Sequence, residues 1–152
     1  MDFHFKQSQS FFRDSLIFAR KERIFIFDFV TMRIKTLYKF VVPLKTQPQY
    51  FKMNDSQTTF VICSPQDGIF FNIATEEEVD LDELYNIGCI KQIAYDAEDH
   101  QFYILANKFE GKLGLFLIVF NEHNPKQYQM LVKIKNLLDV DDAHLSIQRN
   151  KN

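Results

Sequence analysis

A recurring strand ending constrains the fold of this chain more than any other feature of its sequence. Three apolar runs each close on an aromatic residue followed by Asp or Asn, at Phe27-Asp28, Phe71-Asn72 and Phe120-Asn121. The Asx positions 28, 72 and 121 are therefore 44 and 49 residues apart. A regular spacing of this length predicts a repeated unit made of several short strands.

The segments around these endings follow one another in the same order each time. A strand is followed by a polar turn, an apolar strand, a second turn, the strand that closes on aromatic–Asx, and an outer strand. This order predicts an all-β fold of antiparallel four-stranded meanders, arranged as about three β-propeller blades. The expected blades cover about residues 1–40, 47–84 and 89–134, followed by a polar, acidic C-terminal tail at 135–152. A β-sandwich of similar strands is the competing architecture.

Local signals place several of the strands and turns. Residues from Phe11 to Ala19 are predicted to form a strand, strongest over residues 15–19. The strand from Arg23 to Val30 is apolar on both faces, so we expect it to be covered on both sides. The best turn of the chain is 64–68, where Gly68 can take the left-handed conformation.

The sequence resembles the repeats of the WD40-type β-propeller family over most of residues 11–134. Arg23 to Leu37 is similar to the third strand, the aromatic–Asp pair and the start of the outer strand of such a repeat. Phe51 to Val61 resembles its first two strands, and Ile93 to Leu105 repeats that register. Phe replaces the family's Trp in all three copies, Asn replaces Asp twice, and the Gly-His pair is missing. The family's hydrogen-bonded network of Asp, His, Ser/Thr and Trp therefore cannot form in its usual way.

Three blades are too few for a closed ring, because closed propellers have roughly four to eight. An open row leaves unpaired strand edges, which promote aggregation unless something covers them. We therefore expect the chain to be part of a larger propeller or assembly, or to be completed by another chain or its own copy. Protein partners or self-association are expected at the exposed sheet edges.

Composition and charge argue against several classes of function. The chain is 46% hydrophobic and contains 17 Phe but no Trp, which is typical of a globular β protein. A net charge of −2 argues against nucleic acid and against an anionic membrane surface as the main partner. No apolar run approaches the roughly 20 residues of a membrane span, and the N-terminus lacks the apolar core of a secretory signal. The expected location is cytoplasmic.

Residues that commonly carry chemistry are scattered along the chain. Cys63 and Cys89 are too few for a disulfide scaffold and are expected to be buried thiols. None of the four histidines stands at metal-ligand spacing with a cysteine or another histidine: His4, His100, His123 and His144. The glycines are isolated, and no serine lies in a nucleophile elbow. We expect no catalytic residue, no cofactor and no metal.

An acidic run between residues 76 and 83 is the sharpest local feature. Its ordinary interpretation is a solvated surface that keeps the protein in solution, and its functional interpretation is a docking surface for a basic partner. A cation site is disfavoured, because the spacing does not match a calcium loop. The candidate docking residues are Glu76, Glu77, Glu78, Asp80, Asp82 and Glu83.

Two conformations are open to this acidic segment. Thr75 could cap a short helix, with Glu78 at the capping-box offset. Alternatively, the segment is an extended outer strand through Val79 and Leu81. The need for a fourth strand in the repeat favours the extended form.

The repeat architecture and the missing chemistry together predict a non-catalytic protein-interaction or scaffold module built from WD40-like repeats. This is an inference from architecture, and a fold by itself does not fix a function. The alternative is a regulatory β domain that senses a small ligand or a peptide. An enzyme is the third and weakest possibility.

Overall fold

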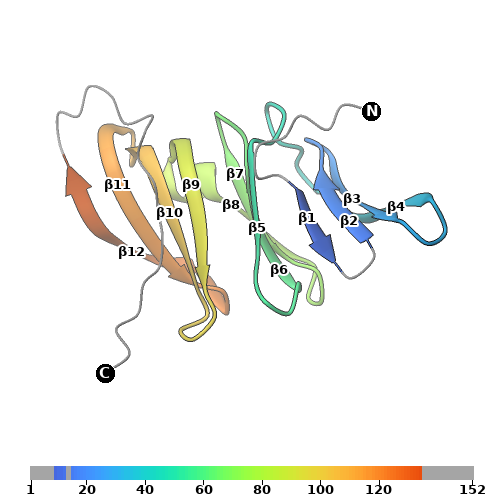
Figure 1. Cartoon of the computed structure of the whole chain (residues 1–152). Coiled ribbons are helices and arrows are strands. Elements are labelled where there is room, and N and C mark those ends of the chain that lie inside the picture. The colour runs from blue at the N-terminus through green and yellow to red at the C-terminus, as the bar shows by residue number, and fades with distance from the viewer. Residues whose placement is uncertain (1–8, 13–14, 135–152) are drawn as a thin grey trace.

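The computed structural model describes residues 9–12 and 15–134, which form three antiparallel sheets and one short helix (Figure 1). In each sheet every strand pairs with the next strand along the chain, so each sheet is a meander. The prediction of an all-β fold of four-stranded meanders is confirmed. Residues 1–8 and the predicted tail at 135–152 lie outside the described residues.

The three sheets take their strands from consecutive parts of the chain. Sheet 1 consists of β1 (Gln9–Phe12), β2 (Ser15–Ala19), β3 (Arg23–Asp28) and β4 (Arg33–Lys39). Sheet 2 consists of β5 (Tyr50–Met53), β6 (Thr59–Cys63), β7 (Gly68–Asn72) and β8 (Glu77–Asp80). The helix α1 (Leu81–Tyr85) follows β8. Sheet 3 consists of β9 (Gly88–Asp96), β10 (Gln101–Phe109), β11 (Lys112–Asn121) and β12 (Asn124–Ile134).

The beginning of sheet 1 differs from the expected single strand over Phe11 to Ala19. This part of the chain forms a hairpin instead, in which Phe12 lies opposite Ser15. A single long strand would leave sheet 1 one strand short of the other two sheets. The hairpin lets the backbone groups of both segments pair with each other, which a continuous strand could not do.

Sheet 2 lies between sheets 1 and 3 (Figure 1). One apolar cluster fills the junction of sheets 1 and 2 and includes Ile24, Phe60 and Phe71. A second cluster fills the junction of sheets 2 and 3 and includes Phe70 and Phe102. Because side chains alternate along a strand, the neighbours Phe70 and Phe71 enter different junctions. Sheet 2 thus buries both faces and joins its neighbours into a propeller-like arrangement that does not close.

Sheet 1 packs only one of its faces against another described sheet. Ile24 and Ile26 of β3 pack toward sheet 2. Phe25 and Phe27 alternate with them, point to the opposite face and are only half-buried. Phe29, which follows β3, is 45% exposed. On this face Phe25 also stacks on the fully buried Phe18, with ring centres 5.3 Å apart, so the side of β3 away from sheet 2 is covered in part. We call the surface formed by Phe25, Phe27 and Phe29 the outer aromatic face.

The structure explains the recurring aromatic–Asx ending. In each sheet the Asx side chain stands at the start of the turn between the third and fourth strands. Its Oδ1 atom accepts a hydrogen bond from the backbone N–H two residues further on, at 2.8 Å for Asp28, 2.9 Å for Asn72 and 2.9 Å for Asn121. Asp and Asn are favoured at such positions because their short side chains can bond to their own turn. The repeat seen in the sequence is thus a repeat of Asx turns.

Gly68 is needed for space rather than for a left-handed backbone. It follows the predicted turn but does not have a positive φ angle, so that expectation is wrong. A Cβ atom at this position would lie 3.2 Å from Ile90 Cδ1 and 3.4 Å from Leu81 Cδ1. The glycine therefore allows close packing of β7 against α1 and the first strand of sheet 3.

The acidic segment is half strand and half helix. The expected extended form holds for β8, but Leu81 begins α1 instead of continuing the strand. The Asp80 side chain caps the helix by accepting hydrogen bonds from the backbone N–H groups of Asp82 and Glu83, at 3.0 and 3.2 Å. The cap allows Leu81 and Tyr85 to be buried on one side of the short helix.

Within the described residues, no helix has the length and apolar character required to cross a membrane.

Candidate functional site

The six acids predicted as a docking surface separate into two groups. Glu78, Asp80 and Asp82 bind other groups of the protein. The remaining three side chains are exposed: Glu76, Glu77 and Glu83. Three of the six predicted docking residues therefore stabilise the structure through contacts within the protein.

Glu78 connects sheet 2 to sheet 1. Its Oε2 atom accepts hydrogen bonds from the backbone N–H of Val41 at 2.8 Å and from the hydroxyl of Tyr38 at 3.2 Å. Its Oε1 atom accepts a hydrogen bond from the backbone N–H of Val42 at 3.3 Å. Burial, together with the nearby charge of Glu78, raises the pKa of Tyr38 to about 12, so the phenol remains a donor. Glu78 thus fixes the chain segment that leaves sheet 1.

Asp82 holds the same connecting segment at a second point. Its carboxylate lies 2.9 Å from Lys45 Nζ. This hydrogen-bonded ion pair raises the pKa of Lys45 and keeps the amine charged. The backbone N–H of Lys45 also donates to Asp67 at 3.0 Å.

A hollow of about 350 Å³ lies beside this connecting segment. It combines carboxylates with exposed apolar side chains, among them Val41, which is 80% exposed. We call it the acidic hollow, and its lining residues are Val41, Val42, Pro43, Asp67, Ile69, Glu76, Glu78, Asp80 and Glu83. Such a surface can attract a basic segment and also contact its apolar side chains.

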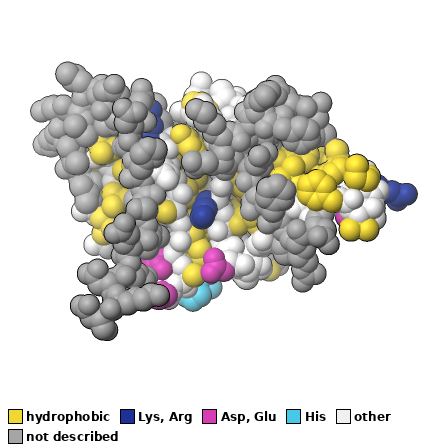
Figure 2. All heavy atoms as spheres, in the orientation of Figure 1, with side chains coloured by type: hydrophobic (Ala, Val, Ile, Leu, Met, Phe, Trp, Pro, Cys, Tyr) yellow, Lys and Arg dark blue, Asp and Glu magenta, His cyan; other side chains and the backbone are white. Residues whose placement is uncertain are grey.

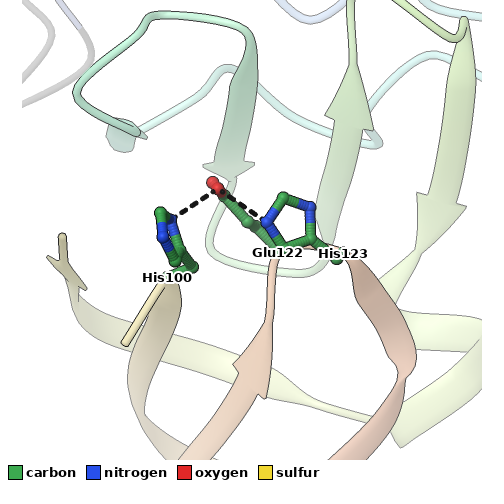
Figure 3. Close-up of side chains that lie close together, drawn as sticks. All are labelled: His100, Glu122 and His123. Carbon is green, nitrogen blue, oxygen red and sulfur yellow. Dashed lines mark hydrogen bonds and ion pairs between the residues drawn. The ribbon is translucent and has the colours of Figure 1, made fainter. Parts of the chain in front are cut away.

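A second constellation was not predicted from the sequence. His100, Glu122 and His123 offer two imidazole nitrogens and one carboxylate oxygen within 4.8 Å of one another. Figure 3 shows the two imidazoles approaching the carboxylate from different sides. Glu122 Oε1 lies 3.2 Å from His100 Nδ1 and 3.5 Å from His123 Nε2. We call these three residues the His–Glu–His cluster.

Glu122 is the buried member of the His–Glu–His cluster. Its Oε2 atom accepts hydrogen bonds from Asn54 Nδ2 at 3.0 Å and from Thr59 Oγ1 at 2.9 Å, both in sheet 2 or the turn before β6. Burial raises the pKa of Glu122, but hydrogen bonds from Thr59, Asn54 and Tyr95 outweigh it, so the pKa lies below its usual value. The cluster therefore contains a charged carboxylate at the junction of sheets 2 and 3.

Two adjacent turns of sheet 3 hold the His–Glu–His cluster in place. The backbone N–H of Glu122 donates to the His100 carbonyl at 2.8 Å. Asn121 Nδ2 donates to the Asp99 carbonyl at 3.1 Å, and Asn121 Oδ1 accepts from the backbone N–H of His123. The turn before β10 and the turn before β12 are thus fastened to each other.

Two imidazoles and a carboxylate make a donor set that suits divalent transition metals. Along the chain, His100 and His123 are far apart, so their spacing gives no sign of a shared site. The predicted order of the meander could have indicated this proximity, because the turns after the first and third strands of a meander lie at the same end of the sheet. His100 and His123 stand in those two turns. The sequence prediction of no metal residue therefore overlooked this juxtaposition.

The cysteines and the two remaining histidines lie outside both the acidic hollow and the His–Glu–His cluster, as far as the structure describes them. Cys63 is a free, buried thiol, and burial raises its pKa, so it is an unreactive part of the core. The side chain of Cys89 lies outside the described residues, as do His4 and His144.

Comparisons with known proteins bear on the fold alone. No protein-family profile matches the chain, and a search of curated protein sequences finds no match. Among solved structures, the tricorn protease matches with a TM-score of 0.54 and 9% identity, over 80% of this chain and 12% of that chain. A chain of the nidogen/laminin complex matches with a TM-score of 0.53 and 11% identity, over 78% and 44%. The N-terminal domain of Nup159 matches with a TM-score of 0.49 and 12% identity, over 83% and 29%.

The chain spans less than half the length of each of these three structures. The two matches with TM-scores above 0.5 support a propeller-like β fold, at sequence identities too low to indicate a function. The resemblance to WD40-type repeats is thus supported at the level of the fold, while no family profile supports the family itself.

Proposed function

We propose that this protein is a non-catalytic interaction module whose open row of sheets is completed by a β-sheet from outside the chain. The observation that carries this proposal is the outer aromatic face of sheet 1. A partner protein or a second copy of this chain supplies the missing sheet. The repeated meander architecture supports a scaffold rather than an enzyme.

The outer aromatic face has the chemistry of a protein interface. Phe27 and Phe29 meet edge to face with ring centres 5.2 Å apart, and the guanidinium of Arg23 lies 5.9 Å from the ring centre of Phe25. Figure 2 shows hydrophobic side chains gathered at the end of the molecule where sheet 1 lies. Aromatic residues and arginine are enriched at the centres of protein interfaces. Because the sheets of this protein stack through their faces, we expect the partner on this face rather than at the sheet edges.

A double variant, Phe27→Ser with Phe29→Ser, tests the proposal. We expect the wild-type protein to form a dimer or larger species, or to bind a sheet-containing partner in cross-linking, and the double variant to lose that association. Leu113→Ser is the matched control, because Leu113 is also hydrophobic and is 81% exposed at the start of β11. Size-exclusion chromatography with light scattering measures the mass. A monodisperse wild-type monomer that cross-links to no protein would contradict the proposal.

The acidic hollow is the second surface that we assign to the partner. Its exposed acids are expected to bind a basic segment, with an affinity that falls as salt is added. Replacing the two exposed acids of the hollow by glutamine should weaken binding without unfolding the protein: Glu76 and Glu83. Binding of a Lys/Arg-rich peptide, followed by fluorescence anisotropy, measures the effect, and equal affinities would remove this assignment.

A ligand-sensing role is the second candidate function. It is favoured by a hollow of about 310 Å³ in sheet 1, lined in part by Arg20, Arg23 and Phe25. A cationic and aromatic lining suits an anionic or aromatic ligand. Such a ligand should raise the melting temperature of the protein, while Arg23→Ala should abolish the rise.

We also propose a cytoplasmic location. The free thiol of Cys63 supports it, because secreted proteins commonly pair their cysteines. Fractionation of cells that express a tagged chain would test it.

A further inference from the structure

We propose that His100, Glu122 and His123 form a binding site for a zinc ion at the junction of sheets 2 and 3. This site lies away from the outer aromatic face and is independent of the proposed interaction. The inference rests on the separation of the three ligand atoms, on the orientation of Glu122, and on the exposure of the two imidazoles.

The distances within the His–Glu–His cluster already approach those around a bound zinc ion. Zinc takes imidazole nitrogen and carboxylate oxygen at about 2.0–2.2 Å in a tetrahedral arrangement, which places neighbouring ligand atoms about 3.3 Å apart. Glu122 Oε1 lies 3.2 Å from His100 Nδ1 and 3.5 Å from His123 Nε2. The third separation, between the two nitrogens, is within 4.8 Å. A small rotation of two exposed side chains brings all three ligands to one ion.

The carboxylate of Glu122 has one oxygen held by the protein and the other directed at the histidines. Asn54 and Thr59 donate to Oε2, while Oε1 faces the two imidazoles. Outer hydrogen bonds of this kind fix the orientation of metal ligands and contribute to affinity.

The surroundings of the His–Glu–His cluster allow an ion to enter and to stay. The side chains of His100 and His123 are 54% and 71% exposed, while that of Glu122 is 5% exposed. The ion thus reaches the buried carboxylate between two exposed rings, and water can supply the fourth ligand. The bonds between the two turns hold the backbone at His100 and Glu122 before any ion arrives. Binding of the ion therefore has to order only the two exposed imidazole side chains, and not the backbone that carries them.

Calorimetric titration of the full chain with Zn²⁺, in a buffer that does not bind metal, tests the site. We expect one zinc ion per chain and a higher melting temperature in its presence. Titration with Co²⁺ should give visible absorption bands typical of a tetrahedral site. The double variant His100→Asn with His123→Asn should lose both signals. Asn suits position 100, where the backbone φ of 55° lies in the left-handed region.

The matched control is His4→Asn with His144→Asn, which removes the same number of histidines and leaves the His–Glu–His cluster complete. This control should bind zinc as the wild type does. Thr59→Val should weaken binding by roughly tenfold or more, because it removes one hydrogen bond that orients Glu122. The proposal is overturned if the wild type takes up no stoichiometric zinc. It is equally overturned if the His100/His123 variant binds as tightly as the control.

Discussion

The two sheet junctions of this protein are built from similar parts but held in different ways. Each contains a group of packed aromatic rings and a carboxylate that reaches across. At the junction of sheets 1 and 2, half-buried Glu78 accepts backbone N–H groups from the connecting segment. At the junction of sheets 2 and 3, buried Glu122 accepts side-chain donors from Asn54 and Thr59.

The two junctions differ in how easily water can replace the carboxylate. Solvent can replace Glu78 as the acceptor for exposed N–H groups, so that junction depends mainly on its rings. Solvent reaches Thr59 poorly, so the loss of Glu122 leaves a buried donor without a partner. The junction of sheets 2 and 3 therefore has a buried polar lock in addition to its apolar contacts, whereas the polar contacts of Glu78 and Asp82 at the junction of sheets 1 and 2 are partly open to solvent.

The largest expected effect comes from the neighbouring residues Phe70 and Phe71. Phe71 stacks on Tyr38 and Phe60, with ring centres 4.7 Å away in both cases, and Phe70 meets Phe120 at 5.6 Å. Replacing either ring by alanine should cost about 3–5 kcal/mol of unfolding free energy, because both side chains are fully buried. Urea unfolding measures the loss.

Hydrogen exchange then separates these two variants. Phe71→Ala should speed exchange in β2 and β3, and Phe70→Ala should speed it in β10 and β11. If both variants accelerate exchange evenly over all three sheets, the junctions are not separate units and the comparison fails.

The two carboxylates provide the next contrast. Glu122→Ala should cost about 2–3 kcal/mol, because it strands the Thr59 hydroxyl in a buried position. Glu78→Ala should cost about 0.5–1 kcal/mol, because water can reach the N–H group of Val41. Chemical denaturation of both variants at pH 7 gives the difference, with Glu77→Ala as an exposed control. Equal losses of unfolding free energy for the Glu78 and Glu122 variants would mean that the greater burial of Glu122 does not make its hydrogen bonds more stabilising.

Two tyrosines test the same contrast with a single hydroxyl group. Tyr85 donates to the Pro125 carbonyl at 2.6 Å in a buried setting, and Tyr38 donates to Glu78 at 3.2 Å in a partly buried one. Tyr85→Phe should destabilise the protein by about 1 kcal/mol and Tyr38→Phe by at most about 0.5 kcal/mol. Thermal unfolding of the two variants side by side is sufficient. A larger loss of stability for Tyr38→Phe than for Tyr85→Phe would mean that polar contacts contribute more at the junction of sheets 1 and 2 than at the junction of sheets 2 and 3.

The smallest expected effect is a pH dependence that arises from Glu122. Its folded-state pKa lies below the usual value of 4.5. The charged carboxylate therefore contributes stability that is complete above pH 4.5 and is lost as the pH falls through the folded-state pKa. Glu122→Gln should flatten the acid side of the stability curve relative to the wild type. Urea midpoints of both proteins between pH 3 and pH 6 measure this difference. Parallel curves for the wild type and the variant would show that the hydrogen bonds of Glu122 do not stabilise its charged form.

Much of the fold could be predicted because its signals are local. The aromatic–Asx endings depend on a turn in which Asp28, Asn72 and Asn121 bond to residues two positions away. Strand alternation and polar turns supplied the order of the meanders. The predictions were wrong where contacts between distant parts of the chain determine the structure. Gly68 is needed because Ile90 of another sheet lies close to it, and Leu81 begins a helix that buries its side chain.

The candidate sites were predicted less completely. The acidic run was found because its charges are adjacent, but its division into bonded and exposed acids depends on partners far along the chain, such as Val41 and Lys45. The His–Glu–His cluster was missed because His100 and His123 meet only when two turns of sheet 3 lie side by side.

The amino-acid sequence was sufficient to predict the number of repeats, the strand order within sheets 2 and 3, and the positions of the Asx turns, because these depend on contacts between near neighbours. Only the tertiary structure decided which face of each strand is covered, which acids are free to meet a partner, and which histidines share a carboxylate. Those outcomes depend on how sheets stack, and stacking brings together atoms that no short stretch of sequence contains.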